Sequence, residues 1–248
     1  MKRLVAFDLD GTLAESKQAI DAEMAALLAS LTEVALVAVI SGGDWPQFQS
    51  QLVDRLPANA RLARFLVMPT TGTKLYRHGP DGWMRVYAEL FSDAERATIE
   101  ARLKAAAEQA GLAGQQVYGP QIEDRGSQIT FSALGQQAPL SVKAGWDPDA
   151  AKRKALKAIL DPQLPGFAIN IGGATSIDVT RAGVDKGYAV RRLSDATGVP
   201  LDAMLFLGDA IFPGGNDYAV KVAGVDSVRV RDVEETRRVV EAVVACLK

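Results

Sequence analysis

Two aspartates stand two positions apart where an apolar run of the sequence ends. The segment VAFDLDGTLAES, residues 5 to 16, contains Asp8 and Asp10 and continues with Gly11 and Thr12. In an extended chain, residues i and i+2 project to the same side, so both carboxylates would enter one crevice. Their mutual repulsion is worth several kcal/mol even with moderate screening, unless a cation offsets it. The pair indicates a cation site, with two aspartates that only cap a turn as the alternative.

A second polar cluster follows the β-branched apolar run at residues 34 to 40. Ser41 ends this run, and Gly42 and Gly43 come directly after it. Such glycines leave backbone N–H groups open to an anion, and ligands of open α/β sheets bind at the carboxyl ends of the strands. The segment therefore indicates a local anion site, although Ser41 could also be a simple turn former.

Two later segments complete the set. Lys186 opens a helical pattern after AGVD, and Asp209 ends another apolar run in LFLGDAIFPGGND, which also contains Asn216 and Asp217. Taken singly, the lysine could be a solvated helix residue and Asp209 a helix cap. Polar residues at the ends of successive strands make coincidence a poor explanation, and they favour one site for a metal ion and a phosphate.

The composition limits which partners are expected. The 248 residues are 48% hydrophobic with a formal net charge of -2, so there is no broad basic surface for nucleic acid or an anionic membrane. No apolar stretch at the start has the length of a signal peptide, and the single cysteine, Cys246, allows no internal disulfide, so a cytoplasmic location is expected. The single histidine, His78, excludes phosphotransfer schemes that need two histidines.

Strand and helix patterns alternate along the chain and are interrupted once. A helical pattern covers 16–31 and a final one lies at the C-terminal end, while apolar runs predict strands at 4–7, 34–40, 66–68, 204–207 and 227–230. This alternation is typical of an α/β domain with a parallel sheet. We therefore expect an α/β core formed by residues 1–81 and 184–248, and an inserted α+β domain at 82–183.

The inserted block, residues 82–183, has a different pattern of predicted helices and strands. Ser92 and Glu95 stand at capping-box spacing before a predicted helix at 93–110, and a second helix is expected with Asp147 as its cap and Pro148 at its first position. Residues that alternate between apolar and polar predict strands at 127–134, 138–145, 166–171 and 175–179. The block is therefore expected to be an antiparallel sheet with two helices.

The segments DLDGTL, Ser41, Lys186 and GDAIFPGGND, in this order, resemble the four motifs of the haloacid dehalogenase (HAD) superfamily. The place of the inserted block, after the third strand, resembles the type IIB capped members. Within that group PGGND, residues 171–190 and residues 123–135 are similar to segments of eukaryotic-type phosphomannomutases. The resemblance implies a Rossmann-like core with a parallel sheet and an inserted α+β cap domain.

The resemblance also implies roles in the core. Asp8 would attack phosphorus and form an aspartyl phosphate, since an aspartate is ionised at neutral pH without assistance. Asp10 would act as general acid and base. Magnesium would be held by the carboxylates of Asp8 and Asp209 and by the backbone carbonyl of Asp10, and Asp217 would support its water shell. The residues expected to bind the phosphoryl group are Thr12, Ser41, Gly42 and Lys186.

In the inserted domain the resemblance assigns substrate contacts to Arg125, Ser176 and Asp178. Arg125 would clamp the distal phosphate of the substrate, and the other two would bind sugar hydroxyls. Asn216 would contact either the substrate or the water shell of the metal. Gln136 departs from the pattern, because the mutases have a second arginine there, which weakens the expected distal phosphate site.

Three functions stay open on the sequence alone. A phosphomannomutase-like enzyme would interconvert hexose 6- and 1-phosphates, with a sugar bisphosphate that phosphorylates Asp8 and a cap that excludes water. A sugar-phosphate phosphatase would share the first half-reaction, and Ser41, where the mutases have a glycine, favours it together with Gln136. A binding protein without activity is the third alternative. Homodimerisation through the cap is expected by resemblance only.

Overall fold

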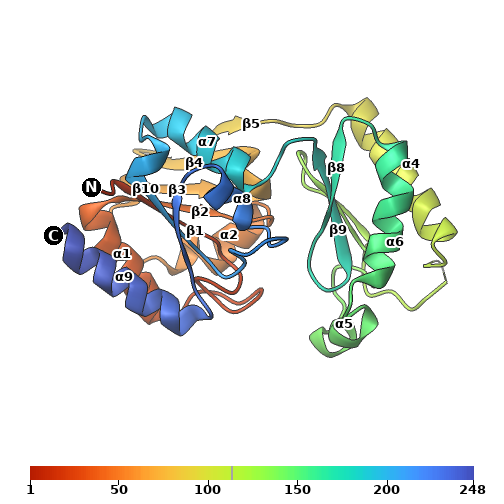
Figure 1. Cartoon of the computed structure of the whole chain (residues 1–248), viewed down its shortest axis with the longest axis horizontal. Helices are drawn as coiled ribbons and strands as arrows, with labels where there is room; N and C mark the ends of the chain where they lie inside the picture. The colour runs from red at the N-terminus through yellow and green to blue at the C-terminus, as the bar shows by residue number, and fades with distance from the viewer. Residues whose placement is uncertain (113) are drawn as a thin grey trace. The chain divides into compact units, whose positions relative to one another are not determined.

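The chain folds into two compact units in the computed structural model, which describes residues 1–112 and 114–248. The first unit contains residues 1–88 and 184–248, and the second contains residues 89–183 (Figure 1). The second unit is therefore an insertion within the first, as the interrupted alternation of elements predicts. Among the described residues, none of the helices combines the length and apolar character that crossing a bilayer requires.

A seven-stranded sheet in the order β11-β10-β1-β2-β3-β4-β5 forms the centre of the first unit. Its parallel strands are β1 (Leu4–Phe7), β2 (Leu36–Ile40), β3 (Phe65–Met68), β10 (Met204–Gly208) and β11 (Asp226–Arg229). An antiparallel hairpin of β4 (Lys74–Gly79) and β5 (Gly82–Ala88) extends the sheet at one edge. The expected parallel α/β sheet is confirmed.

Helices cover both faces of this sheet, which explains why its central strands are apolar on both sides. The helices are α1 (Ala22–Val34), α2 (Trp45–Gln51), α7 (Lys186–Thr197), α8 (Tyr218–Val222) and α9 (Val233–Leu247). Val5 and Phe7 of β1 pack with α1, α2 and α9, whereas Leu4 and Ala6 pack with α7 and α8. The alternation of side chains along one strand thus supplies two separate cores.

The register of the parallel strands decides which side chains meet at the carboxyl edge. Phe7 lies opposite Val39 of β2 and opposite Leu207 of β10. The residues that follow these strands, Asp8 and Asp209 among them, therefore emerge at nearly the same height on neighbouring strands. This is the physical basis for a common site at this edge.

The second unit is a four-stranded antiparallel sheet in the order β6-β7-β9-β8. Its elements are α4 (Asp93–Gln109), β6 (Ile122–Asp124), β7 (Ile129–Ser132), α5 (Leu140–Trp146), α6 (Ala151–Leu160), β8 (Phe167–Ile171) and β9 (Ser176–Arg181). Helices α4 and α6 lie along one face of the sheet (Figure 1), and their apolar side chains belong to the same core as those of the strands. The other face is polar, because Thr130 of β7 and Asn170 of β8 both lie opposite Asp178 of β9.

The structure differs from the sequence prediction at the start of the inserted domain. The expected boundary at residue 82 falls inside the hairpin, whereas the compact units divide between residues 88 and 89. The reason is that β5 pairs with β4 along its length, for example His78 with Trp83, and so belongs to the large sheet. A hairpin signal alone does not tell which sheet a hairpin joins.

A second difference concerns residues 138–145, where a strand was expected. The structure forms α5 there, directly after Pro139, whose fixed φ suits a helix start. The next helix, α6, begins at Ala151 and not at Pro148, although the Asp147 carboxylate still accepts hydrogen bonds from the backbone N–H groups of Lys152 and Arg153. Alternation of apolar and polar residues over so short a segment fits a helix as well as a strand.

The turn after β3 has an unusual backbone. Thr70 and Thr71 have φ angles of 50° and 57°, and Gly72 has a φ of 84°. For β-branched residues the left-handed region is strained. Two hydrogen bonds hold the turn against the loop after β2: Thr70 N–H donates to the Gly43 carbonyl at 2.8 Å, and Thr71 N–H donates to the Ser41 carbonyl at 2.9 Å.

We predict that Gly72→Ala lowers stability strongly. A Cβ atom at this position would lie 2.4 Å from the Cβ of Ala189 in α7, in addition to the backbone strain. Strain of about 1–2 kcal/mol and overpacking of about 1–3 kcal/mol should together lower the urea midpoint clearly. Gly82→Ala is the control, since its φ is also positive but no atom lies within 4 Å. Equal midpoints for the two variants would contradict the close contact with α7.

Candidate active site

A buried lysine joins two aspartates at the carboxyl edge of the large sheet. The Nζ atom of Lys186, the first residue of α7, lies 2.7 Å from Asp8 Oδ1 and 2.5 Å from Asp217 Oδ1. The three residues are 3%, 6% and 0% exposed, respectively. A second oxygen of Asp217 accepts a hydrogen bond from the Ala210 N–H group at 3.0 Å, which fixes the loop after β10. The predicted grouping of Asp8 with Lys186 is present in the structure.

Asp209 adds a third carboxylate to this group. Carboxylate oxygens of Asp8, Asp209 and Asp217 lie within 4.8 Å of one another. The single ammonium of Lys186 leaves two negative charges of the ionised cluster uncompensated. Divalent cations such as magnesium prefer carboxylate oxygens as ligands, so both the donor set and the charge fit a divalent ion. The cluster could therefore hold a metal.

Two glycines make room for the carboxylates of this cluster because they have no side chain. A Cβ atom on Gly11 would lie 2.6 Å from Asp209 Oδ2, and one on Gly208 would lie 2.3 Å from Asp217 Oδ2. Gly11 also has a φ of 80°, which favours glycine. The glycine of the DLDGTL segment and the one before Asp209 thus serve the packing of the carboxylates.

Burial changes the ionisation of the cluster. It raises the pKa of Asp8 to about 7, although Lys186 acts in the opposite direction. Burial and the neighbouring Asp217 raise the pKa of Asp209. Burial alone would lower the pKa of Lys186, but the two carboxylates outweigh it and raise this pKa. With a pKa of about 7, Asp8 is ionised only in part at neutral pH, and a bound cation would favour its carboxylate form.

The Asp10 side chain takes no part in the acidic cluster. Its Oδ1 atom accepts a hydrogen bond from the Lys17 N–H group at 2.6 Å, and its Oδ2 atom lies 3.4 Å from Gln47 Nε2. Gln47 also donates to Gln51 Oε1 at 2.9 Å. The backbone of the loop and α2 thus hold this carboxylate apart from the other three, which suits a separate role in proton transfer.

Among the other expected phosphate-binding residues, Thr12 and Ser41 are buried and Gly42 is half-buried. Thr12 is fully buried, and its Oγ1 atom has no hydrogen-bond partner among the described residues. Such an atom is expected to have a ligand or a water as partner. Ser41 is buried as well, with its hydroxyl 3.5 Å from the Gly43 N–H group, and Gly42 is part of the same loop.

Three further polar residues lie in this region and are absent from the predicted site. Lys74 at the start of β4 forms an ion pair with Asp44 at 2.6 Å, and Asp44 directly follows the Ser41–Gly43 loop. Gln47 contacts Asp10, as described above. Asp44 and Gln47 lie at the start of the helix that follows the predicted anion loop, which was the available signal for them, whereas nothing in the sequence marked Lys74.

The predicted substrate contacts of the second unit form a group of their own. Asp178 accepts a hydrogen bond from Thr130 Oγ1 at 2.6 Å, and its pKa is raised by burial, which Arg125 partly offsets. Arg125 is paired with Glu123 at 2.7 Å. Ser176 and Asp178 lie two positions apart on β9, so both belong to the polar face of the sheet. In the first unit, Asn216 is exposed on the loop before α8.

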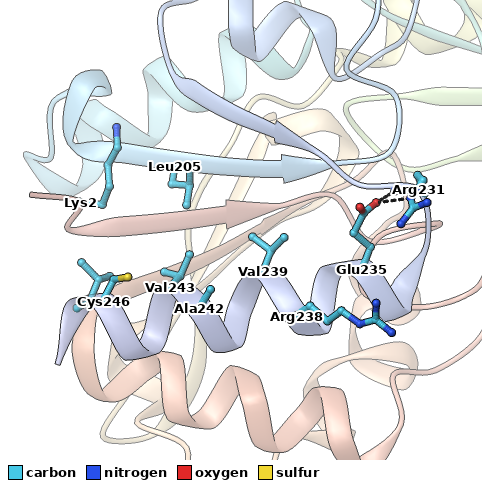
Figure 2. Close-up of a pocket in the computed structure, with 10 residues that line it drawn as sticks. Lys2, Leu205, Arg231, Glu235, Arg238, Val239, Ala242, Val243 and Cys246 are labelled. Atoms are coloured by element: carbon cyan, nitrogen blue, oxygen red, sulfur yellow. Dashed lines mark hydrogen bonds and ion pairs between the residues drawn. The ribbon is translucent and has the colours of Figure 1, made fainter.

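A separate groove lies along α9 (Figure 2), with a volume of about 460 Å³. Figure 2 shows Val239, Ala242 and Val243 of α9 turned toward it, with Leu205 of β10 and Lys2 on the opposite side. None of the residues that line it belongs to the acidic cluster. This groove is therefore distinct from the candidate active site.

Comparison with known proteins decides the family. The family described as eukaryotic phosphomannomutase matches residues 24–246. The chain belongs to the eukaryotic phosphomannomutase family. Phosphomannomutase 1 of Homo sapiens is 28% identical in an alignment of 228 positions, which covers 88% of this chain and 82% of the human protein. Phosphomannomutase of Schizosaccharomyces pombe is 27% identical, over 89% of this chain and 86% of the yeast protein.

Solved structures agree with the fold of this phosphomannomutase family member. The C-terminally truncated Plasmodium falciparum IMP-nucleotidase has a TM-score of 0.71 at 17% identity, over 100% of this chain and 72% of that one. A haloacid dehalogenase-like hydrolase from Bacteroides thetaiotaomicron has a TM-score of 0.64 at 14% identity, over 98% of this chain and 100% of that one. The identities are low, so these likenesses confirm the HAD fold alone.

We predict that divalent-cation binding weakens below neutral pH and releases a proton. The pKa of Asp8 is raised to about 7 without metal, so below this pH a cation must displace the proton of a neutral carboxyl group. The apparent Kd for Mg²⁺ should rise about tenfold per pH unit below pH 7 and level off above it. Titration calorimetry in buffers of different ionisation enthalpy measures both quantities. Affinity independent of pH between 5.5 and 8, about the range of this titration, would contradict the assignment.

Proposed function

We propose that this chain is a magnesium-dependent phosphotransferase that interconverts hexose 6- and 1-phosphates, as a phosphomannomutase does. The observation that carries the proposal is the buried group of Asp8, Asp217 and Lys186, with Asp209 beside it, at the carboxyl edge of the sheet. Membership of the eukaryotic phosphomannomutase family supports the sugar phosphate as substrate. A sugar bisphosphate would act as activator by phosphorylating Asp8.

In the first half-reaction the two aspartates of the DLDGTL segment have different roles, with Asp8 as the nucleophile and Asp10 as the general acid. A carboxylate oxygen of Asp8 attacks phosphorus, and the bond between phosphorus and the ester oxygen breaks. The leaving oxygen takes a proton from Asp10, whose side chain is held apart from the cluster. In the second half-reaction Asp10 accepts the proton of the incoming hydroxyl group, and this kind of catalysis is worth about 10²–10⁴-fold.

The phosphoryl oxygens need donors where their charge accumulates. Thr12 supplies the buried hydroxyl that lacks a partner among the described residues, and Ser41 and Gly42 supply a hydroxyl and a backbone N–H group of the anion loop. Lys186 supplies a buried positive charge next to Asp8. Together they would hold the transferring group in line with the Asp8 carboxylate.

The metal site would be formed by Asp8, Asp209 and the backbone carbonyl of Asp10, and Asp217 would support the water shell of the metal. A bound magnesium ion would neutralise charge on the phosphoryl oxygens and keep Asp8 ionised. The side chain of Asp10 is excluded from this set by its hydrogen bond to the Lys17 N–H group. Asn216, exposed on the same loop as Asp217, would contact a metal-bound water or the substrate.

In the second unit we propose that Ser176 and Asp178 bind sugar hydroxyl groups and that Arg125 binds the distal phosphate. The polar face of β9 and the raised pKa of Asp178, caused mainly by burial, support a site adapted to neutral hydroxyl groups. The boundaries of the unit, 89–183, give the insertion its own core, so it can present these residues without the large sheet.

A sugar-phosphate phosphatase is the second candidate, and one observation favours it. The side chain of Gln136 carries no charge, and its Nε2 atom is buried without a partner among the described residues. A weak distal phosphate site would release the intermediate sugar bisphosphate and leave water as the acceptor for the aspartyl phosphate. Both candidates use the same first half-reaction, so only the acceptor distinguishes them.

Incubation with Mg²⁺, mannose 1-phosphate and catalytic glucose 1,6-bisphosphate tests the proposal. Phosphorus NMR should show mannose 6-phosphate as the main product, and predominant free phosphate would identify the phosphatase instead. Asp8→Asn should abolish both products, because an amide oxygen is not an effective nucleophile. An unchanged thermal midpoint would show that this variant is folded. Turnover by purified Asp8→Asn would place the nucleophile elsewhere.

We predict that Gln136→Arg shifts the products toward the mutase reaction. The new guanidinium would add a bidentate donor for the distal phosphate, with a gain of about 1.5–3 kcal/mol for a charged hydrogen bond. The KM for the bisphosphate should fall about tenfold or more, and the ratio of free phosphate to sugar phosphate should fall with it. Gln137→Arg, one position further along the same loop, is the control. Equal effects of the two variants would indicate a general charge effect.

A further inference from the structure

A buried arginine of the second unit connects the start of α6 with the turn between β8 and β9, which lies next to the proposed sugar site. The Nε atom of Arg153 in α6 donates to Asp147 Oδ2 at 2.8 Å, and its Nη2 atom donates to the Asp147 carbonyl at 2.9 Å. The Asp147 carboxylate also accepts hydrogen bonds from the backbone N–H groups of Lys152 and Arg153, at 3.0 and 3.1 Å. The side chains of the ion pair are 10% and 1% exposed.

The remaining donor of this guanidinium reaches the turn between β8 and β9. Arg153 Nη1 donates to the carbonyl of Gly173 at 2.6 Å and lies 3.3 Å from the carbonyl of Gly172. A buried guanidinium is stable only with its planar donors satisfied, so its geometry dictates where these carbonyls lie. The start of α6 and the turn are thereby held in one fixed arrangement.

This β8–β9 turn packs directly on the side chains of Ser176 and Asp178, the two proposed sugar-binding residues. A Cβ atom on Gly172 would lie 2.9 Å from Asp178 Oδ2 and 2.9 Å from Ser176 Oγ. The Gly172 N–H group donates to the Ser176 carbonyl at 2.9 Å. The other oxygen of Asp178 is held by Thr130 Oγ1 at 2.6 Å. The carboxylate therefore contacts the Thr130 hydroxyl group on β7 and the backbone of Gly172, and it also interacts with the side chains of Gln128 and Arg125.

We infer that Arg153 and Gly172 are positioning residues for the recognition of sugar hydroxyl groups. Arg153 fixes the turn, and Gly172 provides the space in which the Ser176 hydroxyl and the Asp178 carboxylate face the same hydroxyl groups of a hexose. This inference rests on the proposed function for the role of Ser176 and Asp178. The inference adds that Arg153 in α6, which does not touch the substrate, determines how the side chains of Ser176 and Asp178 are oriented.

Gly172→Ala is the sharpest test. Its φ is not in the left-handed region, so the added methyl group acts through contact with the two side chains and not through backbone strain. The KM for the hexose phosphate should rise about tenfold or more. Hydrolysis of acetyl phosphate, a phosphoryl donor without a sugar, should stay within about twofold, because the donor needs only the first unit.

Gly173→Ala is the matched control on the neighbouring residue. There the added Cβ would lie 3.8 Å from Ser176 Oγ, an ordinary contact, and the carbonyl that accepts from Arg153 is kept. The KM for the hexose phosphate should stay within about twofold of the unchanged protein. A KM increase of similar size in both glycine variants would overturn the role of Gly172.

Arg153 itself is tested by Arg153→Met and Arg153→Lys. The methionine variant removes the hydrogen bonds that Arg153 donates to the carbonyls of Gly172 and Gly173 and should raise the KM for the hexose phosphate. The lysine variant keeps one cationic donor and should restore part of the affinity. Thermal unfolding shows at which temperature both variants are folded, and kinetics are compared there. Equal losses with hexose phosphate and acetyl phosphate would show a purely structural role and overturn the inference.

The outcomes distinguish the inference from the function on which it rests. If the unchanged protein forms no aspartyl phosphate from either donor and gives no sugar product, the proposed function fails. If the unchanged protein is active and Gly172→Ala has the same KM for the hexose phosphate, the function stands and the inference is wrong.

Discussion

The ion pairs of Lys186 are the interaction on which the candidate active site depends. Three carboxylates share a small volume at the edge of the sheet, and this buried ammonium is the cation that contacts two of them in the described structure. Removing charges from water is costly, so the arrangement needs a rigid surrounding that keeps every group in place. The parallel strands provide it, because their apolar cores on both faces fix the heights at which Asp8 and Asp209 emerge.

A second constraint acts on the loop of residues 41–43 after β2. The strained turn of Thr70 and Thr71 costs on the order of 1–3 kcal/mol per residue, and such strain persists only where the surrounding structure determines it. Here the hydrogen bonds to the carbonyls of Ser41 and Gly43 do so, together with the Lys74–Asp44 ion pair at the end of the same loop. These contacts fix the shape of the loop from the turn that follows the neighbouring strand β3.

The sequence predicted the parts of this molecule that follow from local periodicity and strand order. The apolar runs located β1, β2 and β10, and parallel strands bring their carboxyl ends together, so the grouping of Asp8 with Lys186 and Asp209 could be foreseen. Long-range pairing could not. The partner of β5 and the helical state of α5 depend on tertiary contacts, and Arg153, which looks like a solvated helix residue, is buried because the turn at Gly173 returns to it.

The choice between mutase and phosphatase depends on charge in the second unit more than on the reacting groups. A mutase must hold a sugar in two orientations, with either phosphate distal, so its distal site must tolerate two positions of one anion. Arg125 is already paired with Glu123 at 2.7 Å, so a phosphate must compete with a carboxylate for it. Lys143, whose Nζ atom lies 3.3 Å from the Gln136 carbonyl, brings a positive charge to the segment that lacks the arginine. In the proposed distal site, one arginine that is already paired and one nearby lysine would bind an anion loosely, which would suit reorientation of a bisphosphate but would also allow its escape.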